Sequence, residues 1–227
     1  MPQNQIKYNS KALYVPVLAL IIIWIIYVIE IKFKLNFNSL GIYPKTVKGL
    51  RGILFSPFIH SDIKHLLNNS VPLFVMLWCL YYFYYKIANK VLILGTILTG
   101  LLTWLIGRPS FHIGASGVIY LLVSFIFFSG IFRKYYRLIA LSLAVVFLYG
   151  GMVWYILPVE ERISWEGHLA GFLVGLLFAF IFRRLGPQPE NFTFTKNEEF
   201  EKLFDDNGNF IPPVEDEEIL EQKADSE

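Results

Sequence analysis

The stretch PSFHIGASGVIYLLVSFIFFSGIF, residues 109–132, contains no Asp, Glu, Lys or Arg. A helix that crosses a bilayer needs about 20 mostly apolar residues, within a range of roughly 17–25. Five further uncharged runs cover residues 12–29, 66–85, 91–107, 138–159 and 167–182, and only the last is marginal in length. Because backbone polar groups in lipid must be satisfied internally, such runs favour helices. We therefore predict an all-α, polytopic membrane protein with six transmembrane helices.

The composition argues against a soluble domain. Hydrophobic residues make up 55% of the 227 residues and charged residues only 17%, whereas soluble domains carry about 25% charge. The single cysteine, Cys79, can form neither an internal disulfide nor a thiolate metal cluster. Buried helices of a soluble protein would explain one or two apolar runs, but six such runs favour a membrane domain.

Charge divides the chain into two parts. Residues 1–185 hold 17 Lys and Arg against 5 Asp and Glu, whereas residues 186–227 hold 3 against 13. We therefore expect a membrane domain over 1–185 and an acidic tail over 186–227. The tail is expected to be largely disordered and solubilising, with a short helix around residues 197–204.

The first apolar run follows Lys7 and Lys11, as the apolar region of a signal peptide would. The run is longer than the roughly 7–15 residues typical of signal peptides, so we expect a retained helix. Short-loop Lys and Arg residues indicate that both termini are cytoplasmic, since the short outer loops carry only Arg108 and Arg162. The loop over about residues 30–64 holds six basic residues and many apolar ones, which suggests that it lies at the membrane interface.

All four histidines fall near helix ends on one predicted side of the membrane, and they are His60, His65, His112 and His168. Ionisable residues at membrane depth are costly and tend to face a polar interior. A zinc site around His60, Asp62 and His65 is disfavoured, because the segment lacks the H-E-x-x-H pattern.

The decisive stretch contains His112-Ile113-Gly114-Ala115-Ser116-Gly117. The glycines permit a tight turn, and Ser116 is expected at a helix N-terminus, where N–H groups and the helix dipole favour negative charge. That environment suits an oxyanion formed when Ser116 attacks a carbonyl carbon. A serine N-cap followed by a packing glycine is the structural alternative.

The sixth run carries Gly167, Gly171 and Gly175 at four-residue spacing, which forms a small-residue stripe. If the stripe packs on the fourth helix through Gly117, the imidazole of His168 approaches Ser116 and can accept its proton. The alternative is a structural histidine bonded to a loop carbonyl.

The second helix begins with His65, and His65 and Asn69 share a helical face because they are four residues apart. Both can donate hydrogen bonds, so the pair can complete an oxyanion hole. A polar pair that satisfies a helix end at the membrane surface remains equally open.

Together these residues resemble the rhomboid family of intramembrane serine proteases. The matching pieces are His60-x4-His65-x3-Asn69, Gly114-x-Ser116-Gly117 and His168-x2-Gly171-x3-Gly175, in the family's order and on its second, fourth and sixth helices. The family commonly carries a Trp-Arg pair in the first loop, where this chain has Leu50-Arg51.

The resemblance implies a role for each matching residue. Ser116 would be the nucleophile and His168 the general base, and His65, Asn69 and a backbone N–H at Ala115 would bind the oxyanion. The supporting residues would be His60, Gly114, Gly117, Tyr120, Gly171 and Gly175, with Tyr120 stacking on His168. No metal, cofactor or nucleic acid is implied.

We therefore expect an endopeptidase that cleaves transmembrane protein substrates in or near their membrane segments, in a bacterial plasma membrane. The rival interpretation is an inactive rhomboid-like protein that binds transmembrane helices. A small transporter is disfavoured, because the polar residues cluster near one membrane face rather than at mid-span.

Overall fold

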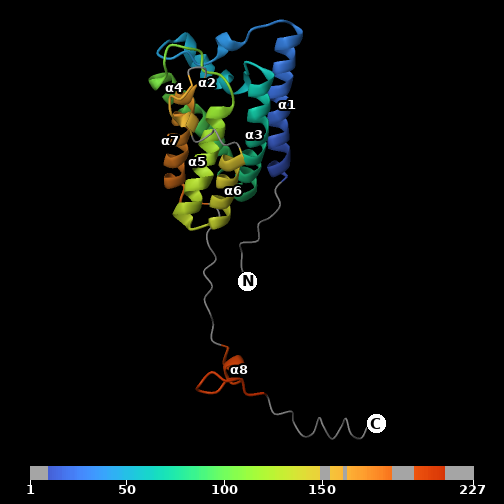
Figure 1. The fold of residues 1–227 in the computed structure, drawn as a ribbon, viewed down its shortest axis with the longest axis vertical. Coiled ribbons are helices and arrows are strands. Elements are labelled where there is room, and N and C mark those ends of the chain that lie inside the picture. Colours follow the sequence, from blue (N-terminus) through green and yellow to red (C-terminus); the bar gives the residue numbers. More distant parts are fainter. Residues whose placement is uncertain (1–9, 149–153, 161–162, 186–196, 213–227) are drawn as a thin grey trace, which may run out of the picture. The chain divides into compact units, whose positions relative to one another are not determined.

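The computed structural model describes residues 10–148, 154–160, 163–185 and 197–212. The chain divides into two compact units between Pro189 and Glu190, and each is described here by itself. All regular elements among the described residues of the first unit are helices or 3-10 turns, joined by loops (Figure 1). The predicted all-α fold is thereby confirmed.

Six helices form the body of the first unit. They are α1 (Lys11–Lys32), α3 (Ile63–Phe83), α4 (Ala88–Ile106), α5 (Ser116–Arg133), α6 (Tyr136–Leu148) and α7 (Trp165–Ile181). Within the described residues, α1, α3, α4 and α5 are long and apolar enough to cross a membrane, whereas α6 and α7 are shorter apolar helices. The predicted polytopic helical bundle is therefore confirmed, and its six helices include four of full spanning length within the described residues.

Two of the predicted helices have different limits. The uncharged run 109–132 becomes helical only at Ser116, because Gly114 has a positive φ of 103° that interrupts any helix before it. In the run 138–159, the helix covers Tyr136–Leu148 and a single 3-10 turn, η4 (Trp154–Ile156), follows later. Absence of charge marks burial in protein or lipid, but it does not separate helix from loop.

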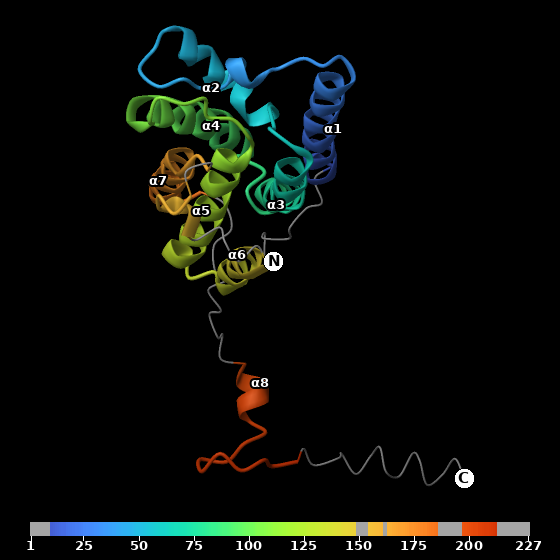
Figure 2. The ribbon, with the colours of Figure 1, turned by 45° about the horizontal axis from the view of Figure 1, so that its top comes forward.

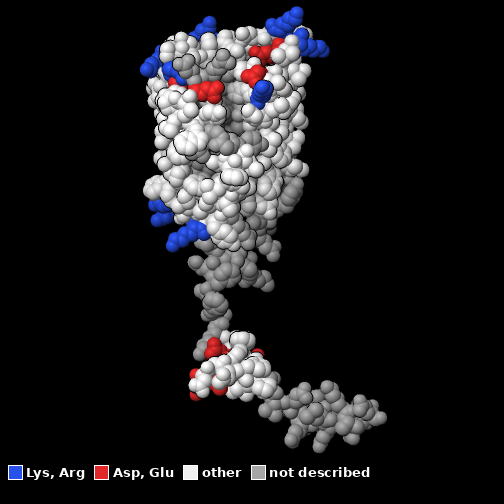
Figure 3. All heavy atoms as spheres, in the orientation of Figure 1, with Lys and Arg blue, Asp and Glu red and all other residues white. Residues whose placement is uncertain are grey.

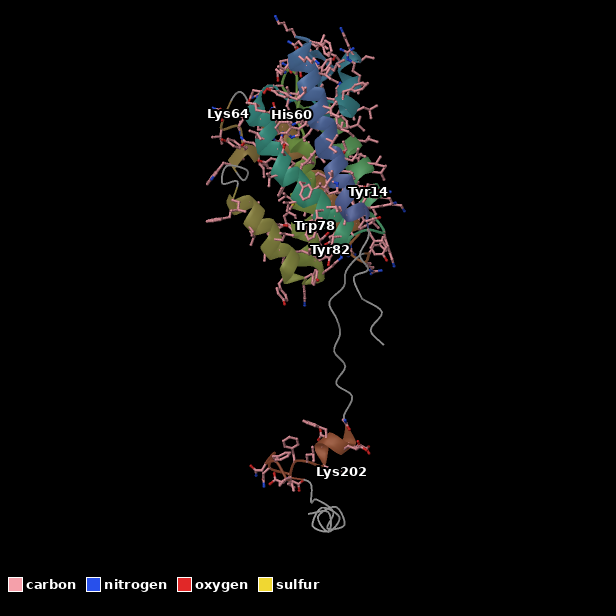
Figure 4. All side chains as sticks on the ribbon, turned by 90° about the vertical axis from the view of Figure 1, so that its right-hand side faces the viewer. Tyr14, His60, Lys64, Trp78, Tyr82 and Lys202 are labelled. Carbon is pink, nitrogen blue, oxygen red and sulfur yellow. The ribbon has the colours of Figure 1, made fainter. Side chains whose placement is uncertain are left out.

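Successive long helices run in alternate directions, so α3, α5 and α7 all begin at the same end of the unit (Figure 1). On the face shown in Figure 3, charged side chains gather at the two ends and leave an uncharged band between them. Figure 4 shows His60 and Lys64 near the end where α3 begins, and Trp78 and Tyr82 toward the other. The predicted site residues on the first loop and at the starts of α3, α5 and α7 therefore lie near the same end of the unit.

Helix α5 lies at the centre of the helical body. It supplies fully buried side chains, including Leu121, Leu122, Phe125 and Ile126, and it packs on α3, α4, α6 and α7. Its closest partner is α7, because Gly171 lies directly against the backbone carbonyl of Gly117. A hydrogen bond from the Ser124 hydroxyl to the Phe172 carbonyl, at 2.7 Å, also joins these two helices.

The long first connection is built from short turns: η1 (Asn38–Leu40), η2 (Lys48–Arg51), α2 (Gly52–Phe55) and η3 (Ser56–Phe58), which Figure 2 shows over the ends of the long helices. Arg51 donates a hydrogen bond to the Ser39 carbonyl at 2.9 Å, and Gly52 packs on the Gly41 backbone. Arg51 thus anchors the loop without the family's neighbouring Trp. Val47, Leu54 and Phe55 are exposed, as expected for a loop at a membrane interface.

The opposite end of α5 is closed by a buried arginine. The Arg133 guanidinium donates to the backbone carbonyls of Phe182 and Leu185 and lies 5.4 Å from the Tyr84 ring centroid. These carbonyls follow the last turn of α7, where a helix lacks hydrogen-bond donors. Arg133 therefore holds the end of α5 to the end of α7.

In the second unit, the structure describes residues 197–212. A four-residue helix, α8 (Glu198–Glu201), is capped by the Asn197 side chain, which accepts from the backbone N–H groups of Glu199 and Phe200. This agrees with the short helix expected around residues 197–204. The expected disorder of the tail concerns residues that lie mostly outside the described part of the chain.

The Gly171 contact leads to a test of the helix packing. A Cβ at Gly171 would collide with the rigid Gly117 backbone, whereas a Cβ at Gly95 would meet the flexible Leu121 side chain at 2.6 Å. Both Gly→Ala changes gain helix propensity, but overpacking typically costs about 1–3 kcal/mol. We expect Gly171→Ala to lower the thermal unfolding midpoint in detergent micelles well below that of Gly95→Ala, and equal midpoints would contradict the tight α5–α7 contact.

Candidate active site

Ser116 is the first residue of α5, and the turn before it explains its position. Gly114 has a φ of 103° and donates its backbone N–H to the Ser56 carbonyl at 2.8 Å. Ile42 and His112 exchange two backbone hydrogen bonds at 2.8 and 3.0 Å, which tie the same turn to the first loop. Ser116 is thereby held where the N–H groups of the first helical turn lack intrahelical partners.

The structure places the Ser116 hydroxyl oxygen 2.8 Å from Nε2 of His168, which lies in the first turn of α7. The two residues come from separate helices and are 52 positions apart in the chain. His168 is 6% exposed, whereas Ser116 is half-buried and lines a pocket. This is the hydrogen bond that proton transfer from serine to imidazole requires.

The other ring nitrogen of His168, Nδ1, lies 2.8 Å from the backbone carbonyl of Tyr155 in η4. A carbonyl only accepts, so Nδ1 carries the hydrogen and a neutral imidazole leaves Nε2 free to accept from Ser116. The sequence analysis missed this role of Tyr155, because a backbone carbonyl has no residue signature. The sequence left open whether His168 contacts Ser116 or a loop carbonyl. In the structure it does both, through its two ring nitrogens.

Tyr120 stacks on His168, with ring centroids 4.2 Å apart and an angle of 16° between the planes. Because Tyr120 is four residues after Ser116, it lies on the same face of α5. The stacking expected from the resemblance is therefore present. It restricts rotation of the imidazole, whose ring is already fixed at both nitrogens.

The glycines expected to pack α5 against α7 do so. A Cβ on Gly175 would collide with the Leu121 backbone carbonyl, and one on Gly117 would lie 3.3 Å from the Gly167 carbonyl oxygen. Together with the Gly171 contact, these small residues bring the two helix backbones together. That close approach allows a short serine and a histidine to meet.

His65 and Asn69 lie beside Gly114, two residues before Ser116. A Cβ at Gly114 would meet Nε2 of His65 at 2.5 Å and Nδ2 of Asn69 at 3.5 Å, so only glycine fits between them and the turn. Asn69 is buried, and its Nδ2 has no hydrogen-bond partner among the described residues. An amide donor without a partner is suited to an oxygen that appears during reaction.

His65 is oriented by polar groups at the start of α3. Its Nδ1 lies 3.2 Å from the Ser61 hydroxyl, which also contacts the Asp62 carboxylate at 2.8 Å. Because a carboxylate only accepts, the Ser61 hydroxyl donates to Asp62, and the Ser61 oxygen can then accept from Nδ1–H of a neutral His65. Asp62 also accepts from the His65 backbone N–H at 2.9 Å and caps α3.

His60 lies before α3 and packs edge-on against His65, with ring centroids 5.0 Å apart. Its two ring nitrogens have no hydrogen-bond partner among the described residues. Burial, with a smaller effect of His65, lowers the pKa of His60 from 6.5 to about 4. Its position fits a supporting role, and no group of three or more metal-ligating side chains occurs within the described ranges.

A pocket with about 400 Å³ of space not filled by atoms lies beside Ser116, between the first loop, α4, α5 and α7. Its polar side chains are those of Ser56, Thr96, Thr99, Thr103, His112 and Ser164. Such a lining suits water, which hydrolysis requires next to the serine. The contribution of the α4 threonines to this lining was not predicted from the sequence.

Comparison with known proteins agrees with this geometry. Residues 48–185 match the Rhomboid domain family. Uncharacterized proteins from Mycobacterium tuberculosis and Mycobacterium bovis are each 34% identical over 174 residues, covering 69% of this chain and 70% of the relative. One from Mycobacterium leprae is 32% identical over 170 residues, covering 69% of this chain and 67% of the relative. The chain therefore belongs to the rhomboid family.

The buried His60 makes stability depend on pH. At pH 7 the imidazole is neutral in both states, but at pH 5 the unfolded chain takes up a proton that the folded protein, with a pKa of about 4, does not. Stability should therefore fall by about 2 kcal/mol between pH 7 and pH 5. Asp62 does not contribute in this window, because the His65 N–H holds the pKa of its carboxyl below the usual value.

His60→Phe keeps the aromatic contact and removes the proton site. We expect its thermal midpoint to change less between pH 7 and pH 5 than that of the unmodified protein. An equal fall in thermal midpoint between pH 7 and pH 5 in both proteins would show that His60 does not cause the pH dependence.

Proposed function

We propose that this rhomboid protein is an intramembrane serine endopeptidase that uses Ser116 and His168. The observation that carries the proposal is the 2.8 Å hydrogen bond from the Ser116 hydroxyl to His168, whose other nitrogen faces the Tyr155 carbonyl. A hydroxyl, a neutral base and a group that fixes the base are the parts that nucleophilic acyl transfer needs. Buried placement near the membrane face suits substrates that are themselves in the membrane.

In the acylation step, the Ser116 oxygen attacks the carbonyl carbon of the scissile peptide, and Nε2 of His168 takes the hydroxyl proton. The imidazolium then gives that proton to the departing amine as the C–N bond breaks. In deacylation, His168 takes a proton from water and the resulting hydroxide attacks the acyl carbon. The bond between that carbon and the Ser116 oxygen then breaks, and the imidazolium returns the proton to the Ser116 oxygen. The Tyr155 carbonyl can accept from Nδ1 throughout.

The tetrahedral intermediate carries a negative oxygen, and the donors near Gly114 are suited to bind it. They are the Asn69 amide and the backbone N–H groups around Ala115 and Ser116 at the start of α5, with the His65 imidazole beside them as a donor when its Nε2 carries a hydrogen. Removing one such donor typically costs about 10²–10³ in kcat. The polar pocket beside Ser116 provides room for the hydrolytic water.

The substrate class follows from the family and from the depth of the site. A transmembrane helix hides its carbonyls in hydrogen bonds, so the substrate must unwind locally before Ser116 can reach one. We propose that the domain over 1–185 carries this activity, with both termini cytoplasmic in a bacterial plasma membrane. The mycobacterial relatives support a bacterial setting.

Purified protein reconstituted with a labelled transmembrane substrate tests the proposal. Cleavage should occur with the unmodified protein and should be lost in Ser116→Ala and His168→Ala. A fluorophosphonate probe should label the unmodified protein and not Ser116→Ala. Substrate binding without cleavage in the unmodified protein would instead favour an inactive rhomboid that binds transmembrane helices.

The oxyanion role of Asn69 has a matched control in its neighbour. Asn69 is buried beside Gly114, whereas Asn68 is exposed on another face of α3. We expect Asn69→Ala to lower kcat by about 10²–10³ with a small change in KM, and Asn68→Ala to leave both close to their original values. Equal kcat values for the two variants would remove Asn69 from the oxyanion hole.

A further inference from the structure

Four polar side chains next to the dyad take no part in the proposed chemistry: Arg108, His112, Ser164 and Glu166. Glu166 is 1% exposed and His112 is 3% exposed, in a part of the protein that is otherwise mostly apolar. A buried carboxylate is costly unless other groups compensate it. Its presence here therefore calls for a structural reason.

Glu166 binds the segment that precedes the serine turn. Its Oε1 accepts from the backbone N–H of Arg108 at 3.1 Å and lies 3.6 Å from Nε of the Arg108 guanidinium. The same guanidinium donates to the Ile163 carbonyl at 2.6 Å. The loop after α4 is thus fastened to the segment that leads into α7 by both backbone and side chain.

His112 adds a second fastening between the same segments. Its Nε2 lies 3.2 Å from the Arg108 carbonyl and its Nδ1 lies 2.6 Å from the Ser164 hydroxyl. Burial lowers the pKa of His112, which favours the neutral ring. A neutral His112 then donates from Nε2 to the carbonyl and accepts at Nδ1 from Ser164. Oε2 of Glu166 lies 4.0 Å from the same Nδ1.

The positions of these residues in the chain give the network its significance. His112 is four residues before Ser116, and Glu166 is two residues before His168. One side of the network therefore belongs to the turn that carries the nucleophile, and the other to the helix start that carries the base. A displacement of about 1 Å between reacting groups can cost on the order of 10²-fold in rate.

We propose that Glu166, together with His112 and Ser164, is a positioning residue that sets the distance between Ser116 and His168. The proposal rests on the proposed function and deepens it. The glycine contacts bring α5 and α7 together along their length, and the network fixes their two starting ends at the level of the dyad. It acts through the dyad and touches no substrate.

The test uses Glu166→Gln, which keeps an oxygen acceptor for the Arg108 N–H but removes the charge that faces the guanidinium. Glu30→Gln is the matched control. Glu30 is also a buried carboxylate that accepts one backbone N–H, from Phe37 at 2.8 Å, but it lies at the end of α1, outside this network. Ser164→Ala, a small change that removes only the partner of His112, serves as the second variant.

Four quantities are measured for each full-length variant in micelles: the thermal midpoint, the rate constant of fluorophosphonate labelling, and kcat and KM for a transmembrane substrate. We expect labelling and kcat to fall about tenfold or more in Glu166→Gln and in Ser164→Ala, with little change in KM. Glu30→Gln should label at the rate of the unmodified protein, even if its thermal midpoint falls as far as that of Glu166→Gln.

Labelling of Glu166→Gln and Ser164→Ala at the unmodified rate would overturn the positioning role while leaving the proposed function intact. The positioning role would also be overturned if labelling slowed in proportion to the loss of thermal stability in all three variants, Glu30→Gln included. The network would then be merely structural. If Glu166→Gln does not fold, Ser164→Ala alone decides between these results. An unmodified protein that is not labelled at all would overturn the proposed function, and this proposal with it.

Discussion

The close contact between the backbones of α5 and α7 is the constraint on which the rest of the site depends. Ser116 has a short side chain, so its oxygen can reach an imidazole on another helix only if the two helix axes come unusually near. Gly171 lies against the Gly117 carbonyl and Gly175 against the Leu121 carbonyl, and any side chain at these positions would separate the helices. In a membrane, where apolar burial gives little preference for one helix pair over another, such close packing is a main source of specificity.

A second constraint on the Ser116–His168 pair is the cost of placing a charge in a buried site. A carboxylate next to His168 would have to be compensated in a buried site, but the Tyr155 carbonyl holds the Nδ1 hydrogen without adding a charge. The one buried carboxylate nearby, Glu166, is engaged by Arg108 instead. Neutral groups therefore orient the base, while the charged pair lies in the segments that position it.

The sequence was sufficient for the all-α class and for the number and order of the helices, because uncharged runs are local patterns. The spacing of serine, histidine and glycine singled out residues that the structure brings together. Ser116 was expected at a helix N-terminus, and the positive φ of Gly114 explains why α5 begins there. The Tyr155 carbonyl was missed because any residue could supply it. The role of Glu166 could not be predicted from the sequence, because its partner Arg108 lies 58 positions away.

The most direct test of the account is a structure of the protein after reaction with a fluorophosphonate. The account predicts a covalent bond from phosphorus to the Ser116 oxygen, with the phosphoryl oxygen directed toward Asn69 and His65 and with His168 still bonded to the Tyr155 carbonyl. An adduct on any other residue, or a phosphoryl oxygen directed away from both donors, would contradict it.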